Sequence, residues 1–255
     1  MLKVENLSFR YSSSGYDVLN GASLELQPGQ IGVVLGKNGS GKTTLFKNLL
    51  NICKPTGGKI LFEGKDLVKM SRRQRAKYIA YVPQDIRFGE LTVFDSVLMG
   101  RVSHFGFRAG ESDYAATEKI LEDMGLSELA DRNVDNLSGG ERQKVAIARA
   151  MAQAPKMMVF DEPTGNLDIA NEHLILKEAK RLATEQNIGI LCSLHDLNQA
   201  LGFADRFFFL KDGVVKYAGG KEMVTEEIIK DIFDISVRIV EIDGQKLILG
   251  GHLYD

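Results

Sequence analysis

A glycine-rich octapeptide at residues 36–43 constrains this chain more than any other part of its sequence. It reads Gly-Lys-Asn-Gly-Ser-Gly-Lys-Thr, follows the apolar run 31–35 and precedes a helical pattern that starts near Leu45. Glycines let consecutive backbone N–H groups turn inward, and the N-terminus of the next helix adds a positive dipole end. Strand, loop and helix in this order are typical of a loop that surrounds phosphate groups. The alternative is a glycine-rich turn that binds nothing, and the flanking strand and helix argue against it.

The side chains of this loop predict that it binds ATP and Mg²⁺. Lys42 would reach the β- and γ-phosphates, and the hydroxyl of Thr43 would hold Mg²⁺. The residues predicted to bind the nucleotide here are Gly36, Lys37, Asn38, Gly39, Ser40, Gly41, Lys42, Thr43 and Thr44.

Three further apolar runs, at residues 78–82, 157–160 and 188–194, resemble the run before the loop. Short continuous apolar runs are typical of parallel strands that are covered on both faces. Each run ends in polar residues of a kind that handles phosphates: Gln84, then Asp161 with Glu162, then His195 with Asp196. One such run alone reads as a core strand and an ordinary polar loop. Four runs together favour a ligand site beyond the carboxyl ends of the strands.

Two adjacent carboxylates, Asp161 and Glu162, follow the apolar run at residues 157–160. Asp161 at the strand end would hold Mg²⁺ through its water shell, and Glu162 would polarise an attacking water. An acidic pair after a strand is usually a solvated loop. Together with Lys42 it indicates more, because P-loop ATPases need a carboxylate for the metal.

The remaining segments predict an α/β fold with three parts in a single domain, residues 1–255. Residues 1–30 and 57–65 alternate apolar and polar positions, around a loop at 12–15, which predicts an antiparallel β part. Residues from about 86 to 155 are mainly helical and interrupt the strand pattern, which predicts an inserted helical subdomain. The rest would form a P-loop NTPase core with a mostly parallel sheet.

Two hairpins are predicted near the C-terminus. Asp212-Gly213 and Asp243-Gly244 each lie between two apolar stretches, and an Asp-Gly pair in that position is a strong hairpin signal. The C-terminal part of the core is therefore expected to contain these two hairpins.

Composition excludes several classes of protein. Lys and Arg number 32 against 34 Asp and Glu, so the net charge of −2 gives no basic footprint for nucleic acid and no polybasic membrane patch. Cys53 and Cys192 are the two cysteines, which argues against a disulfide framework. The N-terminus has no apolar signal core, and the apolar runs fall far below the roughly 20 residues that cross a bilayer. We expect a cytoplasmic protein without a nucleic-acid partner.

The segment Leu-Ser-Gly-Gly-Glu at residues 137–141 precedes a helix with a packed apolar face. Its hydroxyl and free N–H groups at a helix N-terminus form a second candidate anion site, without a lysine or a metal ligand. From the residues alone, a plain N-cap role for Ser138 is favoured.

With this segment in place, the whole chain resembles the nucleotide-binding subunit of an ATP-binding cassette (ABC) transporter. Residues 137–141 are similar to the signature motif of that family, which no other P-loop family carries. The resemblance implies that Ser138, Gly139 and Gly140 contact a nucleotide held by the loop of a second copy. Two copies would then lie head to tail with two ATP molecules between them.

The resemblance also assigns residues that would otherwise have ordinary structural roles. Tyr11 matches the aromatic that stacks on adenine, although alone it reads as a sheet aromatic. Gln84 matches the glutamine that joins Mg²⁺ and the attacking water to the transmembrane partner, and Asp168 lies in the family's short loop after the acidic pair. His195 matches the switch histidine that reads the γ-phosphate. The implied catalytic residues are Glu162, His195, Gln84 and Lys42, and the implied metal-binding residues are Thr43, Gln84 and Asp161.

A finer resemblance concerns the transported solute. Residues 99–101 with His104, and residues 195–200, look like the ATPases of importers for iron-siderophore complexes, haem and vitamin B12. This implies transmembrane permease subunits as partners, a solute-binding protein as an indirect partner, and a place on the inner face of the cell membrane. Residues 162–168 also occur in lipoprotein-release and efflux systems, which is the alternative. A non-transport ABC ATPase acting on nucleic acid would be expected to carry tandem cassettes or a long coiled coil, and a GTPase an Asn-Lys-x-Asp motif; this sequence contains none of these.

Overall fold

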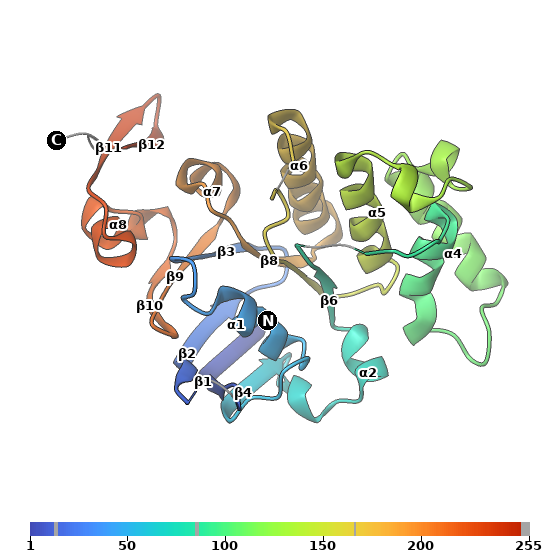
Figure 1. Cartoon of the computed structure of the whole chain (residues 1–255), viewed down its shortest axis with the longest axis horizontal. Helices are drawn as coiled ribbons and strands as arrows, with labels where there is room; N and C mark the ends of the chain where they lie inside the picture. Colours follow the sequence, from blue (N-terminus) through green and yellow to red (C-terminus); the bar gives the residue numbers. More distant parts are fainter. Residues whose placement is uncertain (13–14, 85–86, 166, 251–255) are drawn as a thin grey trace. The chain divides into compact units, whose positions relative to one another are not determined.

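The computed structural model describes residues 1–12, 15–84, 87–165 and 167–250, which fall into two compact units (Figure 1). The first unit joins Met1–Lys69 to Gly189–Asp255, and the second is Met70–Ile188. Residues 13–14 of the expected loop at 12–15, and residue 86 at the start of the expected helical subdomain, lie outside the described residues.

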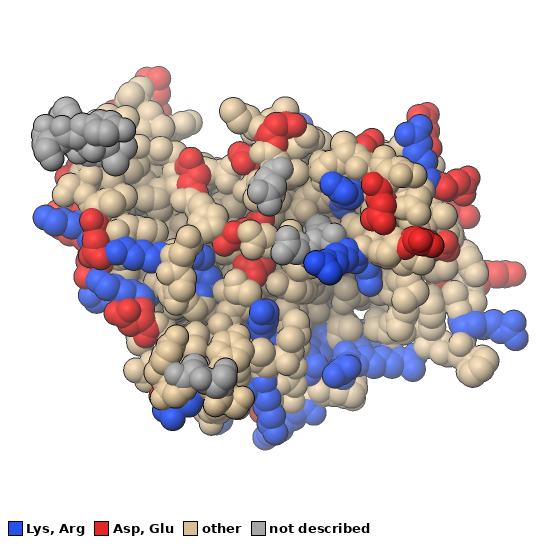
Figure 2. Space-filling model, in the orientation of Figure 1, with Lys and Arg blue, Asp and Glu red and all other residues tan. Residues whose placement is uncertain are grey.

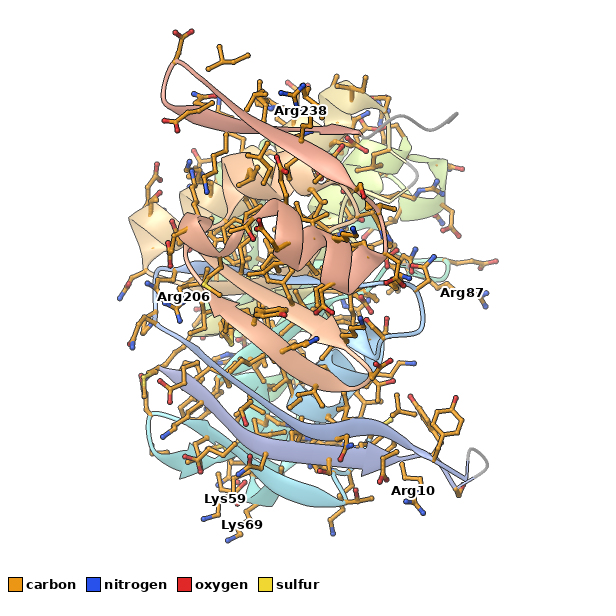
Figure 3. The ribbon with its side chains drawn as sticks, turned by 90° about the vertical axis from the view of Figure 1, so that its left-hand side faces the viewer. Arg10, Lys59, Lys69, Arg87, Arg206 and Arg238 are labelled. Atoms are coloured by element: carbon orange, nitrogen blue, oxygen red, sulfur yellow. The ribbon has the colours of Figure 1, made fainter. Side chains whose placement is uncertain are left out.

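The first unit contains an antiparallel sheet in the order β2-β1-β4-β5. Its strands are β1 (Leu2–Arg10), β2 (Asp17–Leu26), β4 (Gly57–Phe62) and β5 (Lys65–Asp66). Leu2, Val4, Leu7 and Phe9 of β1 are buried, which is the predicted alternation with one shift at Asn6, whose φ is 48°. Arg10, labelled in Figure 3, lies at the end of β1. Its Nε lies 2.9 Å from Oδ1 of Asp17 on β2. The antiparallel part is therefore confirmed.

The same unit contains neighbouring strands in the order β10-β9-β3-β8. These are β3 (Ile31–Leu35), β8 (Gly189–Ser193), β9 (Arg206–Lys211) and β10 (Val214–Gly219). β3 runs parallel to both β8 and β9, and every residue of β3 and β8 is buried. Burial on both faces explains the continuous apolar runs. Helix α1 (Lys42–Leu49) follows β3, and helix α7 (Leu197–Phe203) follows β8.

Both predicted hairpins are confirmed in this unit. Asp212 and Gly213 have φ of 49° and 76° and join β9 to the antiparallel β10. Asp243 and Gly244 have φ of 51° and 74° and join β11 (Val237–Ile242) to β12 (Gln245–Gly250). Two successive residues with positive φ match the right-handed twist of a two-residue hairpin. The other helices among the described residues of the unit are η1 (Leu67–Lys69), η5 (Lys221–Met223) and α8 (Glu226–Phe233).

Where the structure describes it, the second unit is mostly helical and contains one parallel pair of strands, β6 (Ile79–Val82) and β7 (Met157–Phe160). Its helices are α2 (Arg72–Ala76), α3 (Val93–Leu98), η2 (Met99–Ser103), α4 (Glu111–Asp123), η3 (Ser127–Leu129), η4 (Val134–Asn136), α5 (Gly139–Met151) and α6 (Ile169–Gln186). Of the helices in the described residues, none is long and apolar enough to cross a membrane. Parallel pairing in both units, with flanking helices, confirms the predicted α/β fold class.

The segment η2 is packed tightly against the C-terminal end of α5. A Cβ atom at Gly100 would lie 2.1 Å from the carbonyl oxygen of Arg149, so only glycine fits there. Arg101 forms an ion pair with Asp113 at 3.1 Å, and Nε2 of His104 lies 2.9 Å from the carbonyl oxygen of Gln153. Gly100, Arg101 and His104, which belong to the segment similar to importer ATPases, therefore hold η2 against α4 and the end of α5.

Candidate nucleotide-binding and catalytic site

The glycine-rich loop between β3 and α1 presents backbone N–H groups. Gly39 and Gly41 have φ of 81° and 106°, a region that favours glycine. A Cβ atom at Gly36 would lie 2.3 Å from the carbonyl oxygen of Leu210, so that position also requires glycine. Gly41 is the N-cap of α1 and supplies no side-chain hydrogen bond to the helix. The first N–H groups of α1 therefore suit an anionic ligand.

Lys42 and Ser40, two residues of the loop, carry buried polar groups. Lys42 is buried, and its Nζ donates to the carbonyl oxygens of Gly36 at 2.8 Å and Lys37 at 3.2 Å. Oγ of Ser40 is buried and has no hydrogen-bond partner in the part of the chain that the structure describes. A buried hydroxyl of this kind usually has a partner, and a phosphate oxygen would supply one.

Tyr11 lies beside the loop in the same unit. Its ring packs edge-on against Phe9, with centroids 4.7 Å apart, and its hydroxyl lies 3.3 Å from Oγ1 of Thr44 at the start of α1. His195 follows β8 and is exposed, and Asp196 caps the next helix by accepting from the N–H of Gln199 at 2.8 Å. The adenine-stacking role of Tyr11 and the switch role of His195 stay predictions.

In the second unit, the parallel strands β6 and β7 bring Gln84 and Glu162 together. Val82 is aligned with Phe160 in this strand pair, and Gln84 and Glu162 each lie two residues further along the chain. Nε2 of Gln84 donates to Oε2 of Glu162 at 2.8 Å. Glu162 has φ of 50°, which is uncommon outside glycine, and the N–H of Gly165 donates to its carbonyl oxygen at 3.0 Å. Glu162 thus belongs to a constrained turn, and its role in polarising water stays a prediction.

Asp161, the other half of the acidic pair, is 2% exposed. The hydroxyl of Tyr81 on β6 donates to its Oδ2 at 3.3 Å. Burial, the charge of Asp161 and this hydrogen bond raise the pKa of Tyr81, so the phenol stays protonated and remains a donor.

Magnesium fits the oxygen donors that these residues offer. Mg²⁺ is usually held by one or two carboxylates together with substrate phosphates and water. Asp161 in the second unit has a carboxylate and Thr43 in the first unit has a hydroxyl, and their binding of Mg²⁺ stays a prediction. No cluster of three or more His, Cys, Asp or Glu side chains that could hold a metal occurs among the described residues.

Ser138 caps α5 in this structure. Its Oγ accepts from the N–H of Glu141 at 3.3 Å, and Oε2 of Glu141 accepts from the N–H and the hydroxyl of Ser138 at 2.8 and 2.7 Å. These bonds hold the pKa of Glu141 below its usual range. The N-cap interpretation is therefore correct for the single chain, and contact of Ser138 with a nucleotide stays a prediction.

Gly140 has a packing role that the sequence reading missed. A Cβ atom there would lie 2.2 Å from Oδ1 of Asn171 on α6, whereas at Gly139 the nearest atom, in Leu167, would be 3.4 Å away. Asp168 fixes Asn171, because its two carboxylate oxygens accept from the N–H and from Nδ2 of Asn171, each at 2.8 Å. The Asp-x-x-Asn spacing at the start of α6 was the available signal for this cap.

The predicted site residues are divided between the two units. In the first unit they are Tyr11, Gly36, Lys37, Asn38, Gly39, Ser40, Gly41, Lys42, Thr43, Thr44 and His195. In the second unit they are Gln84, Ser138, Gly139, Gly140, Asp161, Glu162 and Asp168. A glycine-rich loop between a parallel strand and a helix, together with an acidic pair at a strand end, defines a P-loop nucleoside triphosphatase.

Comparison with known proteins gives the family. A family profile described as ABC transporter matches residues 19–165, more than half of the chain. The chain belongs to the ABC transporter family, and it is an ATP-hydrolysing subunit of such a transporter.

Three relatives illustrate the likeness over the chain. An uncharacterized ABC transporter ATP-binding protein of Methanocaldococcus jannaschii is 38% identical over 244 residues, 96% of this chain and 95% of the relative. A phosphonates import ATP-binding protein of Synechococcus is 33% identical over 91% of this chain and 90% of its own length. A hemin import ATP-binding protein of Gloeobacter violaceus is 35% identical over 94% of this chain and 90% of its own length.

Two solved structures are similar in fold. One, described as an inward-facing conformation of a metal-chelate type ABC transporter, has a TM-score of 0.85 and 32% identity and covers 100% of this chain and 98% of its own. The other is a dimeric ATP-binding cassette in a post-hydrolysis state with bound ADP and Pi. It has a TM-score of 0.76 and 28% identity, and it covers 86% of this chain and 98% of its own.

Proposed function

We propose that this subunit powers the import of an iron complex, haem or cobalamin. The likeness to a structure described as a metal-chelate type transporter, over the whole chain, is the observation that carries the proposal. The relative that imports hemin supports it. Phosphonates are the second candidate solute, because several phosphonate import proteins are 33–34% identical to this chain.

Two copies of the chain sandwich two ATP molecules in this proposal. The dimeric cassette with bound ADP and Pi supports that arrangement. Each nucleotide is then held by the glycine-rich loop of one copy and faced by Ser138, Gly139 and Gly140 of the other. The charge that develops on the γ-phosphoryl oxygens is stabilised by donors from both sides.

Hydrolysis follows from the groups already described. When ATP binds, Nζ of Lys42 exchanges its hydrogen bonds to two carbonyl oxygens of its own loop for bonds to phosphate oxygens, which are stronger because those oxygens are charged. Glu162 accepts the proton of the attacking water, and Gln84, its hydrogen-bond partner in this structure, orients that water. His195 contacts the γ-phosphate. Mg²⁺, held by Thr43, Gln84 and Asp161, would neutralise phosphate charge when bound.

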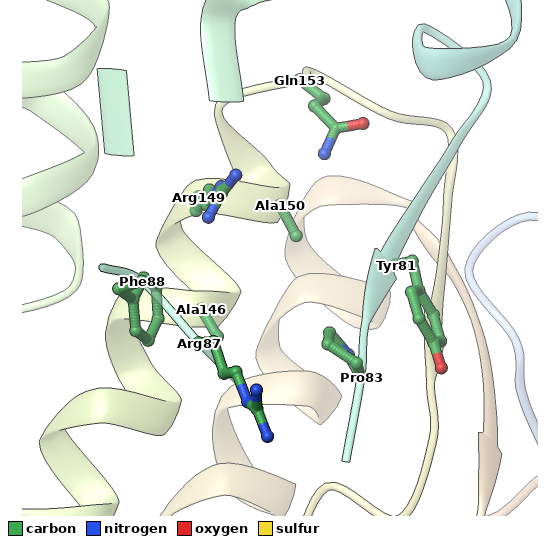
Figure 4. A pocket seen from close by; sticks show the side chains of 8 residues that line it. All are labelled: Tyr81, Pro83, Arg87, Phe88, Ala146, Arg149, Ala150 and Gln153. Carbon is green, nitrogen blue, oxygen red and sulfur yellow. The ribbon is translucent and has the colours of Figure 1, made fainter. Parts of the chain in front are cut away.

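The membrane subunits would bind at two neighbouring cavities of the second unit, which share Arg149 and Gln153 in their linings. A cavity of about 390 Å³ lies among α2, η2 and the end of α5, and a second of about 420 Å³ is shown in Figure 4. Among the described residues that line them, the charged ones are Arg72, Arg73, Arg87 and Arg149. Figure 2 shows basic side chains gathered in the region of α2. Charge complementarity points to an acidic cytoplasmic segment of the permease as the occupant.

A reconstitution experiment tests the proposed solute. The tagged chain would be purified from its native membranes together with its membrane subunits and placed in proteoliposomes. ATP-driven uptake of haem, cobalamin or a ferric siderophore supports the proposal. Uptake of methylphosphonate alone, or ATP-driven export of a lipid-anchored peptide, overturns it. The Lys42→Ala complex serves as the control, since it should transport nothing.

A further inference from the structure

Tyr81 contacts the predicted metal-binding carboxylate, although none of the assignments above gives it a role. It lies on β6, and its hydroxyl donates to Oδ2 of Asp161 at 3.3 Å. Its ring lines the cavity that is drawn in Figure 4, among residues that include Pro83 and Arg149. Tyr81 is therefore next to the acidic pair but is not part of it.

The pairing follows from the register of the two strands. β6 and β7 run parallel with Val82 aligned to Phe160, and the N–H of Asp161 donates to the carbonyl oxygen of Val82 at 3.0 Å. This backbone bond places Asp161 beside the end of β6. The side chain of Tyr81, one residue earlier, can then reach the carboxylate across the strand pair.

A buried carboxylate needs hydrogen bonds, and Asp161 is 2% exposed. A phenol has one hydrogen to donate, and the half-buried Tyr81 directs that hydrogen to Oδ2. A bond to one oxygen restricts rotation of the carboxylate about its Cβ–Cγ bond. The group is then oriented before any ligand arrives.

We propose that Tyr81 is a positioning residue that orients Asp161 for Mg²⁺ in the nucleotide complex. The inference rests on the proposed metal role of Asp161. Groups that hold a metal ligand in place commonly change metal affinity by about 10–100-fold when they are removed. Tyr81 acts through Asp161 and touches neither the nucleotide nor the ion.

Tyr81→Phe tests the inference, because it removes one oxygen atom and keeps the ring that lines the cavity. Tyr78→Phe is the matched control, since Tyr78 lies three residues earlier and its ring faces Nζ of Lys156 at 5.6 Å. Both changes are made in Glu162→Gln protein, so that ATP stays intact. Mn²⁺ replaces Mg²⁺, and its affinity for the ATP complex is read by electron paramagnetic resonance.

We expect Tyr81→Phe to weaken Mn²⁺ binding about tenfold, at the lower end of that range, while ATP affinity without metal stays unchanged. Tyr78→Phe should leave both affinities unchanged. An unaltered Mn²⁺ affinity in Tyr81→Phe, or an equal loss in Tyr78→Phe, overturns the inference. If Asp161→Asn also leaves Mn²⁺ binding unchanged, the proposed metal role of Asp161 fails instead, which separates the two failures.

Discussion

Gly140→Ala should destabilise the protein, whereas Gly139→Ala should not, although the two glycines are adjacent. The new Cβ atom at residue 140 would lie 2.2 Å from Oδ1 and 2.5 Å from Cγ of Asn171. The side chain of Asn171 cannot move away without losing the 2.8 Å bond from its Nδ2 to Asp168, although the bond from its backbone N–H to Asp168 can remain. At residue 139 the nearest contact, 3.4 Å, is ordinary.

The size of the effect follows from three terms. Forcing an extra methyl into a packed interface costs about 1–3 kcal/mol, and losing the hydrogen bond from Nδ2 of Asn171 to Asp168 costs about 1 kcal/mol. Alanine is better than glycine in a helix by about 1 kcal/mol, which offsets part of this. The net loss for Gly140→Ala is about 2 kcal/mol, and Gly139→Ala should be neutral or stabilise by up to about 1 kcal/mol.

Urea unfolding of both variants, followed by circular dichroism, measures the free energy of unfolding. Adding Asn171→Ala to Gly140→Ala removes the clashing amide. The double variant should therefore be more stable than the two separate losses imply, with a coupling of about 0.5–3 kcal/mol. Equal stability of the two single glycine variants would refute the packing argument. Additive losses in the double variant would refute the clash with Asn171.

Three further outcomes can be checked directly. Lys42→Ala should abolish ATP hydrolysis and weaken nucleotide binding, because a hydrogen bond to a charged group contributes about 1.5–3 kcal/mol; wild-type turnover would contradict the loop assignment. His195→Ala should lower kcat far more than ATP affinity, and a large loss of affinity in a binding titration would contradict a switch role. The N–H of Gly110 and, to a smaller extent, Arg101 hold the pKa of Asp113 below its usual 3.8. The stability that ionised Asp113 contributes is therefore fully present above that pH and is lost as the pH falls through the folded-state pKa. The gap in Tm between the wild type and Asp113→Asn should therefore shrink below about pH 4, and a gap that stays constant down to pH 2 would exclude this linkage.

The strands and turns were predictable from the sequence because their signals are local. Continuous apolar runs gave β3, β6, β7 and β8, and the two Asp-Gly pairs gave the C-terminal hairpins. The glycine-rich loop was also predictable, since its function depends on backbone conformation at consecutive residues. The division of the chain into subdomains at the expected boundaries stays a prediction.

Contacts between segments distant in the sequence could not be predicted in the same way. The collision that requires Gly140 depends on Asn171, and the bond from Tyr81 to Asp161 spans 80 residues. Neither partner can be chosen from spacing alone, because the choice depends on how α5 packs on α6 and how β6 pairs with β7. Ser138 shows the opposite case, because its local capping bond was predictable.

The central claim is that one chain holds two incomplete half-sites that ATP brings together in a dimer. Glu162→Gln protein, which keeps the size of the side chain but loses its basicity, should bind ATP without turning it over, since loss of a general base slows a reaction by about 10²–10⁴-fold. Size-exclusion chromatography with light scattering should show a dimer with ATP and a monomer without it. Ser138→Arg in the same protein should abolish the dimer while ATP still binds. Glu162→Gln protein that stays monomeric at saturating ATP, or a Ser138→Arg variant that still dimerises, would contradict the shared site.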